Sequence, residues 1–332
     1  MPKRRRADST NQNPEENVNI LDESGLTRSN IWLEDGNVVL QAEKTLFKIH
    51  RGFLSRISPI FADVFTMAQP DDEPTVEGCP VMQLPGDLAV DIQHALATLY
   101  DKGNMREAIP FDVVAALIRI GRKYEIDHLR REGMTRIEHE LPSELDDVDP
   151  DRYWSEVVYE DGVLYRMTNF AYECDLKHLL PAAFFWSAYE ALDIIALGQP
   201  VKGEDGKRIQ LLPKVQQICL VGRQKLLEAH NQAFEWVGEI GARSDCKDRK
   251  MCQSIAGSLI IALWKPSPDL SAPADSWDVW VDTLEAKQKL KVNKLCSSCL
   301  EYAKSTLLAK RLEFWDKLPS YFGLPSWDEL KK

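Results

Sequence analysis

Four of the chain's seven cysteines form two pairs whose spacing could bind a metal ion. Cys296 and Cys299 make a Cys-x-x-Cys pair, which brings two sulfurs to one ion. Cys246 and Cys252 have five residues between them, which is longer than the usual half-site, and neither pair contains the Gly or Pro of a typical zinc-binding turn. Because four thiolates hold Zn²⁺ tetrahedrally, the chemistry these residues could perform is structural zinc binding.

Two other interpretations of the cysteines stay open. The residues around Cys296 and Cys299 have helical spacing, and two small buried side chains on one helical face would give the same pattern. Buried free thiols are therefore the favoured interpretation, and we expect no cofactor apart from such a structural zinc. A redox pair is the weakest interpretation, because no strand and helix N-terminus precede the pair to lower a thiol pKa.

Enzyme motifs are missing from the sequence. There is no Gly-rich phosphate loop, no His-Glu-x-x-His and no Gly-x-Ser-x-Gly. The six histidines are scattered along the chain and do not share a local motif. We therefore expect a protein that is not an enzyme.

The composition limits the classes of partner and the compartment. The chain has 332 residues and a formal net charge of −11, which argues against a large electropositive surface for nucleic acid. No apolar run is long enough to span a bilayer, and the start is not a secretory signal. An odd number of cysteines without a glycosylation sequon favours a reducing interior, so we expect a cytoplasmic or nuclear protein that is not secreted. The basic cluster Lys3, Arg4, Arg5 and Arg6 is a candidate nuclear localisation signal, or else a solvated basic tip.

The elements that would position these residues begin at Ile31. The turn Asp35-Gly36 between apolar segments predicts a β-hairpin of Ile31–Leu33 with Val38–Ala42. Residues 51–67 have helical spacing, which Ser58-Pro59 divides into two short helices. The other expected elements are strands Thr45–Ile49 and Val81–Leu84, and helices Val90–Tyr100, Phe111–Lys123 and Ile126–Glu140. This order is typical of an α+β fold with helices packed on a small sheet.

Within these elements, one run of residues resembles a known family. A strand ends at His50, and Leu54, Ser58 and Phe61 follow at intervals of four, four and three residues. This spacing resembles the signature of the BTB/POZ domain. Two further stretches strengthen the resemblance, which is greatest to fungal BTB proteins: residues 35–42, with the sequence Asp-Gly-Asn-Val-Val-Leu-Gln-Ala, and the Leu117–Leu129 region, which contains Gly121, Lys123, Tyr124 and Ile126.

The resemblance implies a function in protein binding. BTB domains commonly form homodimers, and some bind cullin-type ubiquitin-ligase scaffolds or transcriptional corepressors. We therefore expect a homodimeric interaction module that presents a helical domain to partner proteins. The alternatives are a substrate adaptor of a cullin-type ubiquitin ligase and a BTB-type transcriptional regulator. The adaptor is weakened because the chain has no kelch-like repeat, and residues 67–77 contain no clean hydrophobic-x-Glu element. The regulator lacks a DNA-reading motif.

The second half of the chain is predicted to be mostly helical, with long helices that include Leu179–Leu197, Leu212–Trp236, Asp248–Trp264 and Trp277–Leu318. Its many tryptophans are expected to be core anchors, and its apolar C-terminal tail is expected to be docked. The acidic run Asp146–Asp151 suggests a solvated linker. The expected organisation is a polar disordered tail at 1–28, a BTB/POZ domain at 29–141, an acidic linker at 142–152 and an α-helical domain at 153–332.

Overall fold

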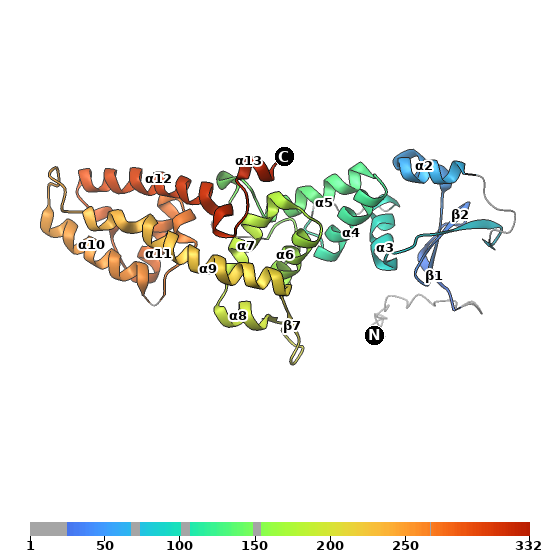
Figure 1. Cartoon of the computed structure of the whole chain (residues 1–332), viewed down its shortest axis with the longest axis horizontal. Helices are drawn as coiled ribbons and strands as arrows, with labels where there is room; N and C mark the ends of the chain where they lie inside the picture. The colour runs from blue at the N-terminus through green and yellow to red at the C-terminus, as the bar shows by residue number, and fades with distance from the viewer. Residues whose placement is uncertain (1–24, 68–73, 101–106, 149–153, 266) are drawn as a thin grey trace, which may run out of the picture. The chain divides into compact units, whose positions relative to one another are not determined.

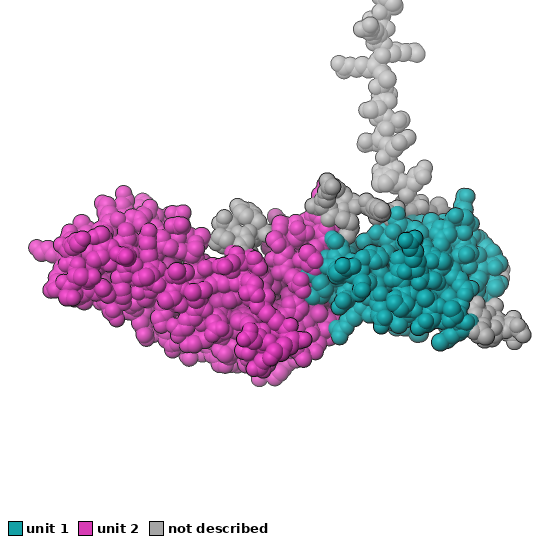
Figure 2. All heavy atoms as spheres, turned by 90° about the horizontal axis from the view of Figure 1, so that it is seen from above, with its two compact units in different colours: residues 1–105, 112–134 teal, residues 106–111, 135–332 magenta. Residues whose placement is uncertain are grey.

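The computed structural model describes residues 25–67, 74–100, 107–148, 154–265 and 267–332. The chain divides into two compact units: unit 1 comprises residues 1–105 and 112–134, and unit 2 comprises residues 106–111 and 135–332 (Figure 2). Unit 1 combines a small mixed sheet with helices, and the described part of unit 2 is mostly helical. The predicted α+β class is thereby confirmed.

The sheet of unit 1 has five strands in the order β1-β3-β2-β5-β4. Its strands are β1 (Thr27–Trp32), β2 (Val38–Ala42), β3 (Thr45–Ile49), β4 (Thr75–Val76) and β5 (Cys79–Gln83). The central strand β2 pairs antiparallel with β3 and parallel with β5, while β1 pairs parallel with β3. Both faces of the centre are covered, because Val39, Leu40 and Phe47 are all buried.

The predicted hairpin at Asp35-Gly36 is wrong. The hairpin joins β2 to β3, and its turn contains Glu43 with a positive φ of 50°. Gly36 is instead needed for a close approach, since a Cβ atom there would lie 2.9 Å from Lys48 Cγ and 3.1 Å from the backbone nitrogen of Ile49. The Asp-Gly pair therefore lies in the connection from β1 to β2, and these two strands both pair with β3 and not with each other.

The helices of unit 1 follow the predicted order (Figure 1). They are α1 (Arg51–Ile57), α2 (Pro59–Thr66), α3 (Ala89–Tyr100), α4 (Phe111–Lys123) and α5 (Asp127–Glu140). The break between α1 and α2 is confirmed at Ser58, whose hydroxyl accepts a hydrogen bond from the Phe61 backbone N–H at 3.1 Å. Pro59 then occupies the first turn of α2, where its missing N–H costs nothing.

The last turns of α5 hold the segment that follows in unit 2. The Arg136 side chain is 2% exposed and donates to the carbonyl oxygens of Glu107 and Glu156 at 2.9 and 3.0 Å. The carboxylate of Glu140 accepts the backbone N–H groups of residues 155, 156 and 157 at 3.0, 2.8 and 3.1 Å. The division between the two units falls inside this helix, after residue 134. The domain boundaries expected at 28, 141 and 152 remain predictions, and residues 149–153 of the expected linker lie outside the described residues.

Unit 2 begins with three helices around a buried aromatic core. These are α6 (Val163–Glu173), which the sequence did not predict, α7 (Leu180–Tyr189) and α8 (Leu192–Leu197). They pack with α9 (Pro213–Phe234), a helix of 22 residues that contacts α6, α7 and α8. The expected helix over Leu179–Leu197 is interrupted at Glu190 and Ala191, whose backbones are extended or otherwise non-helical.

Three helices complete the other part of unit 2: α10 (Arg249–Trp264), α11 (Trp277–Gln288) and α12 (Ser297–Tyr321) (Figure 1). The predicted continuous helix Trp277–Leu318 is wrong, because α11 ends at Gln288 and is followed by Lys289, which has a left-handed φ of 56°. The short helix α13 (Trp327–Leu330) then docks on α12, with Trp327 8% exposed and stacked on Trp315. The expected docking of the apolar tail is confirmed.

Candidate functional site

Three of the four residues of the BTB-like signature, Leu54, Ser58 and Phe61, lie in the core of unit 1. Leu54 and Phe61 are 1% and 2% exposed. Ser58 is fully buried, and its hydroxyl donates to the carbonyl oxygen of Tyr124 at 2.6 Å, which ties the start of α2 to the end of α4. Phe61 stacks on the Tyr124 ring with centroids 4.4 Å apart. These three residues hold the helices together and present no reactive group to solvent.

His50, the fourth residue of the signature, is partly exposed and contacts an acidic side chain. Its Nε2 atom lies 3.0 Å from the Oδ1 atom of Asp35, so the imidazole meets an exposed carboxylate. The hydrogen bond from His50 holds the pKa of Asp35 below its usual range. The backbone N–H of His50 donates to the Tyr100 hydroxyl at 3.2 Å. His50 therefore links the start of α1 to the Asp35 turn and to α3.

Helices α1 and α2 carry apolar side chains that are only partly buried. Four of them are here called the α1–α2 strip: Phe53, Ile57, Ile60 and Val64. Met67, at the end of α2, is 66% exposed. Burying such side chains against a partner would remove apolar surface from water, which is favourable. The strip is consequently the candidate binding surface of this unit.

The four candidate metal ligands come together in unit 2. Their sulfur atoms all lie within 4.8 Å of one another, and we call this group the thiol cluster: Cys246, Cys252, Cys296 and Cys299. Each pair has one member just outside a helix and one member in its first turn. Cys296 is the N-cap of α12, and Cys299 follows in its first turn. Cys252 lies at the start of α10, whose N-cap is Asp248. The interruption of the predicted long helix therefore frees Cys296 to face Cys246.

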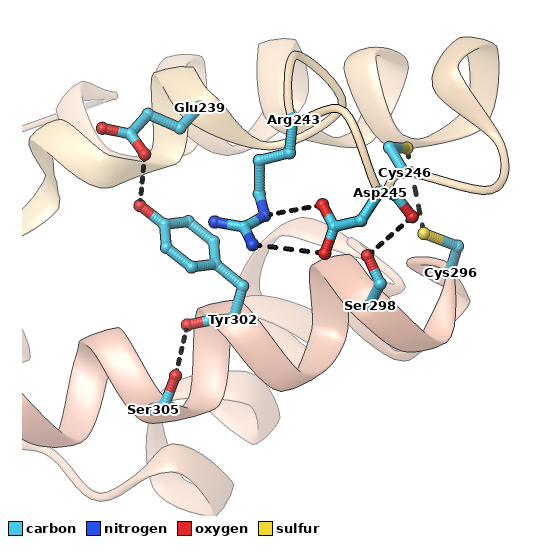
Figure 3. Close-up of polar contacts among 8 residues, drawn as sticks. All are labelled: Glu239, Arg243, Asp245, Cys246, Cys296, Ser298, Tyr302 and Ser305. Carbon is cyan, nitrogen blue, oxygen red and sulfur yellow. Dashed lines mark hydrogen bonds and ion pairs between the residues drawn. The ribbon is translucent and has the colours of Figure 1, made fainter.

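Polar contacts hold the two loops of the thiol cluster together (Figure 3). Arg243 forms a bidentate ion pair with Asp245, with N–O distances of 3.1 and 3.2 Å, and its guanidinium lies 4.2 Å from the centre of the Tyr302 ring. The Ser298 hydroxyl donates to the carbonyl oxygen of Asp245 at 3.0 Å. The loop before α10 is thereby fastened to the first turns of α12, next to the Cys246 and Cys296 sulfurs.

The sulfur atoms experience unequal surroundings. Cys252 and Cys299 are fully buried, whereas Cys246 and Cys296 are partly exposed. Hydrogen bonds from the backbone N–H groups of Cys299 and Lys247 lower the pKa of Cys296 to about 6. Burial raises the pKa of the Cys252 thiol. The cluster thus contains one sulfur that is stabilised as a thiolate beside another that is costly to ionise without a cation.

Unit 2 also contains a cavity of about 480 Å³ between α9, α10 and α11. Its lining includes the polar side chains Arg223, His230, Asp269 and Asp275. His230 is 1% exposed, and neither ring nitrogen has a hydrogen-bond partner among the described residues. Burial lowers the pKa of His230 to about 4, while burial and the nearby Asp269 raise the pKa of Asp275 to about 7. Sequence reasoning missed this cavity, because its lining comes from residues spread over a hundred positions.

The tryptophans of unit 2 mostly pack in its core, as predicted. Trp186, Trp236, Trp280, Trp315 and Trp327 are all at most 8% exposed. The indole N–H groups of Trp315 and Trp327 donate to backbone carbonyls at 3.1 and 2.8 Å, but that of Trp236 has no partner among the described residues. The other candidate site, the basic cluster of residues 3–6, lies outside the described residues.

Comparison with known proteins identifies one part of the chain. Residues 33–141 match the BTB/POZ domain family. This segment is therefore a BTB/POZ domain, which is a protein-interaction domain. No curated protein matches the chain. No helix in the described part of the chain is long and apolar enough to cross a membrane.

Proposed function

Because residues 33–141 are a BTB/POZ domain, we propose that the protein is an interaction module that homodimerises through this domain and presents its helical unit 2 to partner proteins. The family match is the observation that carries the proposal. The α1–α2 strip supports it, since Phe53, Ile57 and Ile60 are apolar side chains that the chain itself leaves partly uncovered. A second copy of the same strip would cover them in a symmetric, self-complementary contact.

The experiment for dimerisation is sedimentation equilibrium of the complete chain over a range of micromolar concentrations. We expect a dimer, and we expect Ile60→Glu to shift the equilibrium to the monomer, because a buried carboxylate in the contact would lack a partner. Thr66→Glu is the matched control, since it adds the same charge to an exposed position of α2. Thermal melts of both variants show whether they are folded. A wild-type protein that is monomeric throughout this range contradicts the proposal.

Unit 2 supplies apolar side chains for partner binding on α10. Ile260, Ile261 and Trp264 are 48%, 57% and 44% exposed, which is unusual for three large apolar residues within one and a half turns. We infer that partner proteins bind this face of α10. Affinity purification with wild type and Ile261→Asp, followed by mass spectrometry, tests this inference. Specific partners should be lost with Ile261→Asp and retained with the exposed control variant Lys250→Asp. If both variants recover the same partners as the wild type, the inference is contradicted.

The identities of the recovered proteins decide between the narrower roles. Cullins among the partners would support an adaptor of a ubiquitin ligase, and corepressors would support a transcriptional regulator. Self-association without either would leave the interaction module alone. Expression of the tagged chain with and without residues 3–6 tests whether it is nuclear, cytoplasmic or both, and whether the basic cluster directs it to the nucleus.

A further inference from the structure

We propose that the thiol cluster binds one Zn²⁺ ion as a structural site. The observation behind this proposal is convergence: the two cysteine pairs are 44 or more residues apart in sequence, yet their four sulfurs lie within 4.8 Å of one another. The other three cysteines, Cys79, Cys174 and Cys219, do not join this group. Packing of small side chains alone would not bring four sulfur atoms to one point from two separate loops.

The distances fit a single tetrahedral ion. Zinc–sulfur bonds are about 2.3 Å long, so the sulfurs of a four-thiolate site lie about 3.8 Å apart. The Sγ atoms of Cys246 and Cys296 are 3.8 Å apart, and the longest separation in the cluster needs only a small contraction. All four ligands come from the protein, so the site has no open position for a substrate. It is therefore a structural site and not a catalytic one.

The surroundings of the cluster suit the negative charge of four thiolates around Zn²⁺. The first turns of α10 and α12 both begin at the cluster, so the positive ends of two helix dipoles are close to it. The backbone N–H of Cys296 donates to the Cys252 sulfur at 3.4 Å. The cationic side chain of Lys247 follows Cys246 directly in the chain, while Arg243 in the same loop is paired with Asp245. Each cysteine loses its thiol proton to solvent on binding, and no oxidant is consumed.

The ligand type selects the metal. Four soft thiolates in tetrahedral arrangement are typical of zinc or of an iron–sulfur centre, and the compactness of the group favours one ion. The ion would fasten the start of α10 to the start of α12. Hydrogen bonds of Ser298 to Asp245, of Lys247 to Ser297 and of Tyr302 to Glu239 also join the segments before α10 to those that begin α12. We infer that this end of unit 2 depends on the metal for its stability.

Metal analysis of the complete chain tests the proposal. The protein is purified under reductant, loaded with Zn²⁺, freed of excess metal by gel filtration and measured by inductively coupled plasma mass spectrometry. We expect one zinc ion per chain in the wild type and a loss of zinc in Cys252→Ser and Cys299→Ser. Cys219→Ser is the matched control, because Cys219 is equally buried in the same unit but lies outside the cluster, and it should keep its zinc. A ratio near zero in the wild type, or full zinc in Cys299→Ser, overturns the proposal.

A second measurement does not depend on the folding of any variant. Wild-type protein loaded with Co²⁺ should show the visible bands of tetrahedral cobalt and the near-ultraviolet charge-transfer bands of thiolate ligands. Their absence overturns the four-thiolate assignment. Iron that resists displacement by zinc overturns the choice of metal. Peptide mapping without reductant that finds Cys246 joined to Cys296 in protein lacking zinc shows a disulfide and overturns the proposal as well.

Discussion

The carboxyl group of Asp275 is held in a place that disfavours its charge. Burial and the neighbouring Asp269 raise its pKa to about 7 from 3.8. The folded protein therefore binds this proton more tightly than the unfolded chain does, so the free energy of unfolding falls as the pH rises from 3.8 to about 7 and is constant above that range.

The variant Asp275→Asn should remove this pH dependence, because an amide remains neutral. One pKa unit corresponds to about 1.4 kcal/mol, so with partial solvent exposure we expect a gain of about 2 kcal/mol above neutral pH and little difference in acid. Urea unfolding at several pH values measures it. The control Asp278→Asn changes an exposed carboxylate of α11 and should leave the curve as it is. Equal stability of Asp275→Asn and wild type at alkaline pH would show that Asp275 is not buried in this way.

His230 in the same cavity should act in the opposite direction. Burial lowers its pKa to about 4 from 6.5, so the unfolded chain binds this proton more tightly and stability falls as the pH drops through that interval. We expect His230→Phe to abolish this loss and to stabilise the protein by about 1 kcal/mol, since a buried polar ring without a partner is replaced by an apolar one. The measurement is the same urea series, with His139→Phe as the exposed control. If His230→Phe loses as much unfolding free energy in acid as the wild type does, His230 is not the group responsible.

At the residue scale, the sequence predicted the roles of side chains that contact their neighbours in the chain. It did not predict the roles of side chains that contact residues far away in the sequence. Ser58 as a cap and Pro59 in the first helical turn are local, and both were predicted. Gly36 was misread, because a close approach by Lys48 and Ile49 cannot be seen from neighbouring residues. The shifted pKa values of His230 and Asp275 result from burial in a cavity between three helices, so no local sequence pattern predicts them.

Among the elements, the C-terminal tail closes unit 2. Trp327 is 8% exposed, stacks on Trp315 and donates to the Trp315 carbonyl oxygen at 2.8 Å. We expect Trp327→Ala to lower the free energy of unfolding by about 3 kcal/mol, because a large aromatic side chain leaves a cavity behind. Thermal or urea unfolding measures the loss. The exposed control Lys332→Ala should have almost no effect, and a Trp327→Ala variant as stable as this control would show that the tail is not docked.

The helices whose apolar faces repeat over several turns were predicted, among them α4, α5, α9 and α10. Helix ends were less predictable. Trp277–Leu318 has helical spacing throughout, but Lys289 adopts a left-handed conformation and ends α11. That interruption places Cys296 at a helix start, whereas the sequence predicted that Cys296 and Cys299 lie within a continuous helix.

For the whole molecule, each unit contains an apolar cluster of its own. One apolar cluster joins β2, β3 and β5 in unit 1, and another joins α9–α12 in unit 2. We expect calorimetry of the complete chain to show two unfolding transitions, because each core can unfold on its own. A strong zinc chelator should lower the midpoint of the transition of unit 2 and leave that of unit 1 in place. A single transition that shifts as a whole would contradict this independence.

The contacts at the end of α5 determine where a stable fragment of the BTB/POZ domain can end. A fragment cut at Leu141, where the family match ends, would retain the Arg136 guanidinium and lose its acceptor on Glu156. The Glu140 carboxylate would lose all three of its backbone donors in the same cut. An isolated domain of that length would therefore lack these contacts and be less stable at this end, although Arg136 would keep its acceptor on Glu107.

Extending the fragment through Val158 restores these partners, because residues 155–157 return to Glu140 and the backbone N–H of Val158 donates to the carbonyl oxygen of Ile109 at 2.9 Å. If the fragment that ends at Leu141 self-associates and the one that ends at Val158 does not, the association comes from the lost contacts of α5 and not from the α1–α2 strip.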